Sequence, residues 1–230
     1  MLNHLFHINV MKMKLLAAFT AVLLSSIIMN AEEKQFSAPA TTGGMPINEV
    51  VAKRHSSVTF DKSRPVDQKT LGQLLWMTLG VNRPDAPVGK LGKANRTNPT
   101  AINAQEVTAY VFDTDGVWEY IASDNKLVKR ADGDHRDLLA GTPQFRQDFV
   151  LDAPISVLLV TDTEKFAGMG PRAIEAAMID AGIANQNLNL AAESLGLATR
   201  PRMTMDIEAI RTLLKLKDTQ IPALNNPIGY

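Results

Sequence analysis

The chain has 230 residues, and its 24 Lys and Arg balance its 24 Asp and Glu, so the formal net charge at pH 7 is zero. This length suits one medium domain or two small ones, and the balanced charge gives no support to nucleic-acid binding. Cysteine is absent, which excludes disulfides, thiolate metal sites and a cysteine nucleophile. Only four His are present, two of them near the N-terminus, so we predict no metal site.

The N-terminus, residues 1–31, is typical of a secretion signal. Lys12 and Lys14 precede an uncharged run, Leu15–Met29, and Ala31 stands before the charged Glu32. A basic region, an apolar region and a small residue in this order indicate a cleaved signal peptide. The run is shorter than the roughly 20 residues of a spanning helix. We therefore expect a periplasmic or secreted protein without a membrane span after cleavage; a retained anchor helix is the alternative.

The first part of the mature chain is predicted to be a leader followed by helices. Residues 32–45 are polar and rich in Gly, Pro, Ala and Thr, and they predict a flexible leader before one domain over 46–230. Helices are predicted over Ile47–Arg54 and Asp67–Leu79, the second with Asp67 as its N-cap. Residues 81–99 contain three Pro and two Gly and predict a long loop.

Strand-like segments follow this loop. Glu106–Asp113 and Val117–Ala122 are rich in β-branched and aromatic residues, and the Asp115-Gly116 pair between them predicts a hairpin. Ile155–Thr161 is a continuous apolar run, typical of a strand buried on both faces. The remaining predicted elements are a strand over Lys126–Arg130, helices over Asp134–Ala140, Pro171–Leu197 and Asp206–Lys217, and a strand over Gln220–Tyr230. This succession predicts one α+β domain with an antiparallel sheet flanked by helices.

Three motifs carry more specific information. They are Lys53–Phe60 (KRHSSVTF), Arg96–Gln105 (RTNPTAINAQ) and the helical stretch Asn185–Leu197. In this order and at these spacings they resemble the FMN-dependent nitroreductase family, over roughly residues 46–230. Leu74–Trp76, Gly80–Arg83 and Gly116–Tyr120 resemble most its SagB-type dehydrogenase branch.

The resemblance implies a three-layer nitroreductase-like fold and a homodimer with FMN in clefts between the subunits. The long Ala-rich helix would then pack against its twin. The implied activity is the transfer of hydride or electrons from a reduced donor, such as NAD(P)H, to a nitro compound, a quinone or a similar small acceptor. The SagB-type relatives instead oxidise peptide azolines. Because the flavin carries the chemistry, no catalytic side chain is identified.

The resemblance assigns the FMN phosphate to the first motif. Arg54 and Ser56 match the family's phosphate binders, and a guanidinium fork with a hydroxyl suits a phosphate dianion. His55 lies between them and would add a main-chain or ring donor. On these residues alone the alternative is a helix end with a serine cap beside solvated charges.

Val58 departs from the family pattern. The family usually has Arg or Lys at this position, facing the flavin N1–C2=O edge, and the loss of that cation is expected to lower the reduction potential. Another cation, such as Arg83, Arg96 or Arg202, could replace it. The alternative is that Val58 only packs and that no flavin binds.

The second motif is matched to the isoalloxazine ring. Pro99, Thr100, Ala101 and Asn103 correspond to the segment that holds the ring from the partner subunit. Proline and small residues allow a close approach, and an Asn amide can pair with polar atoms of the ring. A proline-started turn before a strand is the alternative.

The remaining predicted contacts come from the second half of the chain. Gln147 is expected at the pyrimidine edge of the flavin. Met203 and Thr204 lie where related enzymes place backbone donors near flavin N5. Gly229-Tyr230 resembles the family's terminal strand but lacks the cation that relatives often carry just beyond it, so phosphate binding is expected to depend mainly on Arg54.

Two functions from other classes stay open. One is a non-catalytic flavin-binding or small-ligand-binding protein on the same scaffold, and the other is a structural homodimer without a ligand, because a fold does not fix a function. Export also raises a question, since NAD(P)H is a cytoplasmic donor: either the donor differs or the signal interpretation is wrong. Asp134–Asp137 is expected to be a solvated helix start and not a site.

Overall fold

The structure, a computed structural model, describes residues 31–85 and 94–230. Residues 1–30 of the predicted signal peptide, including its apolar run, and the middle of the predicted 81–99 loop therefore lie outside the described residues. The chain divides into two units, Met1–Glu32 and Glu33–Tyr230, and every element named below belongs to the second.

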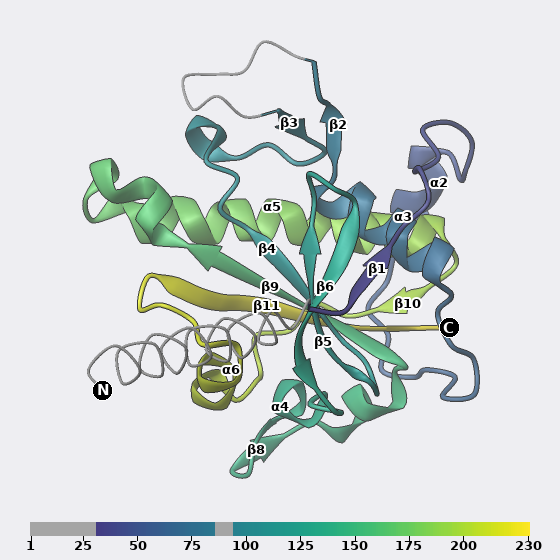
Figure 1. Cartoon of the computed structure of the whole chain (residues 1–230). Helices are drawn as coiled ribbons and strands as arrows, with labels where there is room; N and C mark the ends of the chain where they lie inside the picture. Colours follow the sequence, from purple (N-terminus) through teal and green to yellow (C-terminus); the bar gives the residue numbers. More distant parts are fainter. Residues whose placement is uncertain (1–30, 86–93) are drawn as a thin grey trace, which may run out of the picture. The chain divides into compact units, whose positions relative to one another are not determined.

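Helices and strands are interspersed along this unit, and α5 is the long helix (Figure 1). The helices are α2 Ile47–Lys53, α3 Gln68–Leu79, α4 Asp137–Ala140, α5 Arg172–Ser194 and α6 Ile207–Leu214, with 3₁₀ turns η1 Ala101–Asn103, η2 Asp148–Asp152 and η3 Thr163–Met169. The strands are β1 Glu33–Gln35, β2 Val81–Arg83, β3 Asn95–Arg96, β4 Thr108–Phe112, β5 Gly116–Ile121, β6 Lys126–Asp132, β7 Gly141–Thr142, β8 Phe145–Arg146, β9 Ile155–Asp162, β10 Ala198–Thr199 and β11 Gln220–Gly229.

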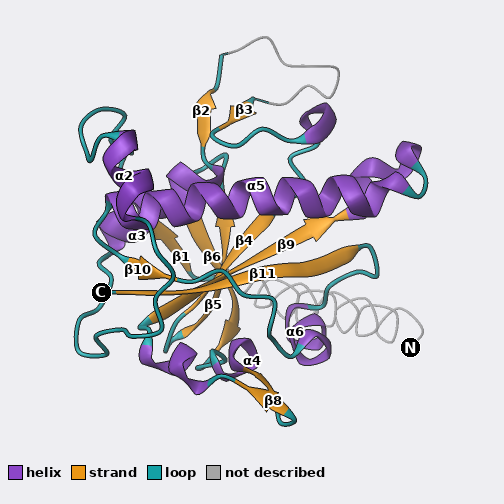
Figure 2. Ribbon diagram, turned by 180° about the vertical axis from the view of Figure 1, so that it is seen from behind, coloured by secondary structure: helices purple, strands orange, loops and turns teal. Residues whose placement is uncertain are grey.

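Seven of these strands form the central sheet in the order β1-β6-β5-β4-β9-β11-β10. Every neighbouring pair in it is antiparallel. Figure 2 shows α5 crossing one face of the sheet together with α2 and α3, and α4 and α6 on the other face. The predicted α+β fold, an antiparallel sheet flanked by helices, is confirmed.

The centre of the sheet is buried on both faces, as the apolar run predicts. All eight residues of β9 are buried. Successive side chains of a strand point to opposite faces, so Val157 packs with Leu188 in the core beneath α5, while Leu158 packs with Ile210 in the core beneath α4 and α6. Burial of each such side chain contributes about 1.5–3 kcal/mol.

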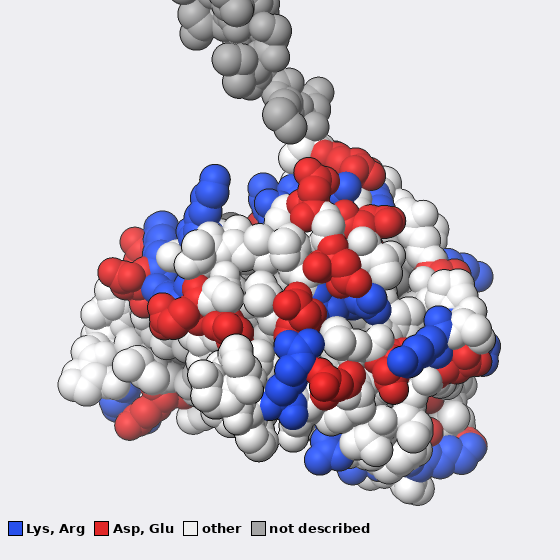
Figure 3. All heavy atoms as spheres, turned by 90° about the horizontal axis from the view of Figure 1, so that it is seen from below, with Lys and Arg blue, Asp and Glu red and all other residues white. Residues whose placement is uncertain are grey.

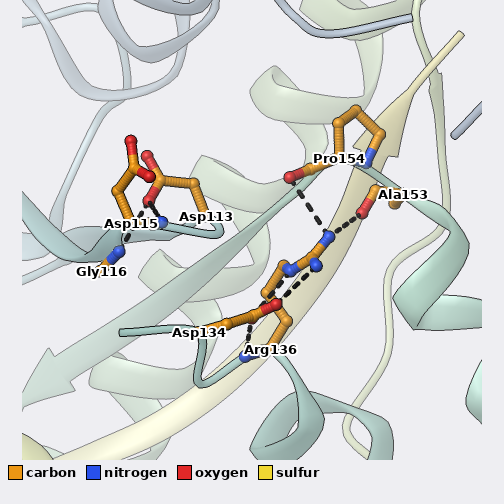
Figure 4. A network of polar contacts seen from close by, with 7 residues as sticks. All are labelled: Asp113, Asp115, Gly116, Asp134, Arg136, Ala153 and Pro154. Atoms are coloured by element: carbon orange, nitrogen blue, oxygen red, sulfur yellow. Dashed lines mark hydrogen bonds and ion pairs between the residues drawn. The ribbon is translucent and has the colours of Figure 1, made fainter. Parts of the chain in front are cut away.

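Local capping signals also place the turns and helix ends. Asp67 accepts a hydrogen bond from Thr70 N at 2.9 Å and begins α3, as expected of an N-cap. In the β4–β5 hairpin, Asp113 Oδ1 accepts the N–H groups of Asp115 at 2.9 Å and of Gly116 at 2.8 Å (Figure 4). A side chain on Gly116 would collide with the Ala131 carbonyl, so the turn requires glycine here.

The prediction of a flexible leader over 32–45 is wrong for its first part. Glu33–Gln35 form β1, an edge strand paired with β6. The next residue, Phe36, is buried and lies against Tyr120, with 6.4 Å between ring centroids. Further along, the Ala40 N–H donates to Gln73 Oε1 at 2.8 Å. One buried aromatic ring and main-chain pairing therefore hold a segment whose composition alone is loop-like.

Two other predictions need correction. The described ends of the 81–99 loop pair with each other as β2 and β3. The helix expected from Asp134 begins only at Asp137, because the preceding Arg136 is held elsewhere: it donates to Ala153 O at 2.8 Å and to Asp134 Oδ2 at 2.6 Å (Figure 4). Its side chain is 13% exposed, so Arg136 ties two loops together and is not a solvated residue.

On the face in Figure 3, acidic and basic side chains are interleaved and form no single-sign field. Within residues 31–85 and 94–230, no group of three His, Cys, Asp or Glu is placed to hold a metal ion. No helix in the same residues has both the length and the apolar character needed to cross a membrane.

Candidate functional site

The predicted phosphate residues follow the end of α2. Arg54 is the C-cap of this helix, and its N–H donates to Val50 O at 2.9 Å. The next turn is fixed by Ser57, whose hydroxyl donates to Thr59 O at 2.9 Å and whose N–H donates to Thr199 O at 3.0 Å. In the described part of the chain, neither the Arg54 guanidinium nor the Ser56 hydroxyl has a partner, so both donors are available to a ligand.

The predicted backbone donors lie on the same edge of the sheet. Beyond Thr199, the chain forms a bridge in which Arg202 and Asn225 exchange both main-chain hydrogen bonds, at 2.9 and 2.8 Å. The Thr204 carbonyl accepts from Asn225 Nδ2 at 2.9 Å. The N–H groups of Met203 and Thr204 donate to no acceptor among the described residues, and the Met203 side chain is 69% exposed.

Gln147 is joined to this edge by Arg202. The Arg202 Nε donates to Gln147 Oε1 at 3.0 Å, although the two residues lie 55 positions apart. The Gln147 N–H donates to Ala140 O at 2.9 Å and fixes its backbone. Arg202 was named from sequence only as one of three replacement cations, and nothing local signals that it contacts Gln147.

The edge half-site is the name used below for Arg54, His55, Ser56, Val58, Gln147, Met203 and Thr204. The structure places these predicted residues on segments linked through Thr199 and Arg202. Two residues of this half-site offer less to a ligand. The His55 ring already contacts Lys53 O at 3.1 Å, and Val58 is 47% exposed but has no polar side-chain group.

The other predicted residues lie around η1, outside the edge half-site: Pro99, Thr100, Ala101 and Asn103. They are called the α5 segment below because they are bonded to helix α5, although they are not part of it. The Ala101 N–H donates to Asp180 Oδ2 at 2.7 Å and fastens the segment to the middle of α5. Asn103 Oδ1 accepts from Gln105 Nε2 at 2.9 Å, which orients its amide. Ile102 has φ 51° and Asn103 has φ 56°, a left-handed conformation that costs an Ile side chain energy.

Buried carboxyl groups beneath this segment escaped the sequence analysis. Glu106 is 4% exposed and Asp180 is 3% exposed. Burial raises the pKa of both, and for Glu106 the neighbouring Asp180 raises it further. Arg96 opposes that rise from β3, and it donates to Val107 O at 3.1 Å. An acid before an apolar strand and another inside an Ala-rich helix are the signals in the sequence that could have found this pair.

The two groups of predicted residues do not meet within one chain. The end of α2 lies beside Glu193, near the end of α5, whereas Ala101 is bonded to Asp180. Thirteen residues of helix at 1.5 Å each separate these points by about 20 Å. Figure 2 shows the same arrangement, with α2 at one end of α5 and β3 over its middle part.

Exposed apolar side chains lie between and around these groups. Ile174 is 57% and Ile179 is 63% exposed on α5, and Ile102 on the α5 segment is 63% exposed. Ile47 and Val51 on α2 are similarly open. Large apolar groups gathered on one side of a fold are typical of a surface covered by another molecule.

Comparisons with known proteins agree with this fold. A candidate nitroreductase of Methanocaldococcus jannaschii is 28% identical over 188 residues, covering 80% of this chain and 90% of that protein. The crystal structure of a candidate nitroreductase from Ralstonia eutropha is similar with a TM-score of 0.75 and 26% identity, covering 88% of this chain and 91% of the other.

A third likeness is to a longer protein. The crystal structure of a candidate nitroreductase from Anabaena variabilis has a TM-score of 0.68 and 18% identity, over 86% of this chain and 41% of that one; at this identity it supports the fold alone. The Nitroreductase family pattern itself matches residues 51–230. This chain therefore belongs to the nitroreductase family.

Proposed function

We propose that this protein is an exported, FMN-dependent oxidoreductase whose flavin lies between two copies of the chain. The observation that carries the proposal is the division of the predicted binding residues. The edge half-site and the α5 segment are about 20 Å apart along α5, so a single copy does not close a flavin site, and a second copy is needed to bring an α5 segment to each edge half-site.

The edge half-site has donors of the kind that FMN requires. Arg54 and Ser56 offer a guanidinium and a hydroxyl to a phosphate, a pairing that is strong because it is charge-assisted. The free N–H groups of Met203 and Thr204 can meet acceptors of the ring system. The amide of Gln147 adds a further polar contact at the other side of Arg202.

The α5 segment suits the flat ring of a flavin. Pro99 and Ala101 are small enough for a ring to approach the backbone closely, and Ile102 offers an exposed apolar surface. Ala101 of this segment is bonded to Asp180, the chain neighbour of Ile179, whose side chain is exposed on α5. Covering this surface with a twin copy would remove it from water and complete the site in one step.

When bound, FMN would supply the two-electron chemistry, and the protein positions it. We propose a nitro compound, a quinone or a similar small organic molecule as the acceptor. Azoline oxidation, the chemistry of the SagB-type relatives, is a narrower possibility that depends on the Leu74–Trp76 and Gly116–Tyr120 motifs. NAD(P)H is the donor only if it reaches the exported enzyme; a periplasmic or secreted location requires another reductant.

The proposal is tested on the full chain, expressed in a bacterial host and purified after export. Its absorbance near 450 nm is recorded with added FMN, then after dithionite and after a quinone. A retained yellow colour that bleaches and returns supports the enzyme. A protein that never retains FMN contradicts the proposal.

A non-catalytic flavin-binding protein is the second candidate. The exposed valine at position 58, where the family usually has a cation, is the observation in its favour. It predicts the same yellow colour with no re-oxidation by quinones or nitro compounds.

A further inference from the structure

Arg202 is a buried cation without an anionic partner. Its residue is 5% exposed, and its guanidinium donates only to neutral acceptors: Gln147 Oε1 at 3.0 Å, Leu139 O at 2.6 Å, Ala140 O at 3.3 Å and Asn225 Oδ1 at 2.8 Å. No carboxylate among the described residues pairs with it, and the segments outside them contain no Asp or Glu. A buried charge that has no opposite charge beside it is destabilising.

This charge persists at neutral pH. Burial, together with the nearby Arg200, lowers the pKa of Arg202 to about 10, which leaves it protonated. The ring of Phe149 lies 5.4 Å from its guanidinium carbon and offers weak compensation through its π face. A buried cation beside a candidate binding site favours the binding of a ligand that carries negative charge.

The contacts of Arg202 also decide how Gln147 is oriented. A guanidinium has donors only, so the oxygen of the Gln147 amide must face it and the NH₂ group must face away. That NH₂ group has no partner within the described part of the chain, and Gln147 is half-buried. The same guanidinium holds Asn225, whose Nδ2 fixes the Thr204 carbonyl. One residue therefore sets a side-chain donor and the backbone that carries the free N–H groups.

We infer that Arg202 is the positioning residue of the flavin's pyrimidine edge, orienting Gln147 as a donor and supplying the positive charge that Val58 does not. This inference rests on the proposed function. The other two candidate cations are worse placed: Arg83 is exposed, and the charge of Arg96 faces Glu106. Neither contacts the edge half-site.

A cation at this place acts more on one redox state than on the other. Two-electron reduction gives a flavin with negative charge at its pyrimidine edge, so a nearby cation strengthens the binding of reduced FMN relative to oxidised FMN. The neutral donor of Gln147 affects both states. The charge of Arg202 should therefore appear in the midpoint potential, and its hold on Gln147 should appear in the affinity for oxidised FMN.

The test measures the Kd of oxidised FMN and the midpoint potential of the bound flavin in the wild type and two arginine variants. In Arg202→Gln, we expect reduced FMN to lose about tenfold in affinity relative to oxidised FMN, which lowers the potential by about 30 mV for a two-electron couple. Arg200→Gln is the matched control, since this neighbour also lies near Phe149, at 6.0 Å, and has no contact with Gln147. It should shift the potential by less than a third of that amount.

Two more variants keep the inference testable if Arg202→Gln does not fold, as judged by circular dichroism. Arg202→Lys retains the charge, so it should keep a potential near the wild-type value while it raises the Kd of oxidised FMN. Gln147→Leu should raise this Kd as well. The double variant, which combines Arg202→Lys with Gln147→Leu, should raise the Kd no further than Gln147→Leu alone. Additive effects, or a wild-type Kd in Arg202→Lys, would overturn the inference.

The outcomes separate the two proposals. A wild-type protein that binds no FMN contradicts the proposed function itself. A wild-type protein that binds FMN, with an unchanged potential in Arg202→Gln or an equal shift in Arg200→Gln, overturns the role of Arg202 and leaves the proposed function standing.

Discussion

The edge half-site and the α5 segment are built in opposite ways. The first includes regular main-chain pairing between Arg202 and Asn225, and several of its donors have no acceptor among the described residues. The second contains left-handed residues, is bonded to α5 through Asp180, and lies near a pair of buried acids. One region offers polar donors, whereas the other combines a left-handed backbone, an exposed apolar side chain and nearby buried acids. This contrast supports the proposal that one chain supplies two different halves of a shared site.

The largest effect should come from separating these halves. In Ile179→Glu, a carboxylate replaces an exposed apolar side chain on α5, and burying it between two copies without a partner is costly. We expect dimer affinity to fall at least a hundredfold, about 2.7 kcal/mol, with loss of bound FMN. Sedimentation velocity with flavin absorbance measures both.

The matched control for this change is Ile207→Glu, at an exposed apolar position on α6, which lies on the opposite face of the sheet. It should keep the dimer and the flavin. If Ile179→Glu stays dimeric and yellow, α5 does not form the interface and the two halves do not meet across it.

A smaller effect is expected from the edge half-site alone. Arg54→Ala removes the guanidinium that is free to hold the phosphate and should weaken FMN binding at least tenfold, about 1.4 kcal/mol. Fluorescence titration of FMN measures this loss. Arg130→Ala is the control, because Arg130 is exposed and pairs with Glu119 on the strands β5 and β6. Equal affinities of wild type and Arg54→Ala would remove the phosphate assignment.

The smallest effect concerns the acids beneath the α5 segment. The pKa of Glu106 is raised from 4.5 to about 8, first by burial, so the folded state holds more protons than the unfolded state between these pH values. The free energy of unfolding therefore falls as pH rises through this window. Glu106→Gln keeps a donor toward Asp180 but cannot ionise, so it should flatten the decline.

Thermal unfolding at pH 5 and pH 8 measures this change. The variant should gain several degrees in Tm over the wild type at pH 8 and little at pH 5, since each kcal/mol corresponds to roughly 2–4 °C in a chain of this size. Glu119→Gln, at a partly exposed ion pair, is the control. A wild-type Tm that is equal at both pH values would contradict a titration of Glu106 in this window.

The features that could be predicted from the sequence are those that depend on interactions between residues close together in the chain. Asp67 as a cap, the Asp115-Gly116 turn and the doubly buried β9 depend on neighbours in the chain, and all three are confirmed. The strand β1 was missed because its pairing with β6 spans 91–95 positions. A polar three-residue strand leaves no local signal.

The candidate site shows the same limit. The motifs suggested its residues because the resemblance depends on local spacing, and the structure shows which of these segments are bonded to one another. The bond between Arg202 and Gln147 joins residues 55 positions apart, and the Glu106–Asp180 pair spans a comparable separation. Such pairs are set by how the sheet and α5 are folded together, which periodicity and composition do not encode.

The central claim is that two copies of this chain hold FMN between them, and analytical ultracentrifugation recorded at both 280 and 450 nm tests it most directly. The account predicts a single boundary at the mass of a dimer, seen at both wavelengths. The ratio of the two absorbances should correspond to one flavin per chain. Flavin that sediments with a monomer, or a dimer that carries no flavin after incubation with FMN, would contradict it.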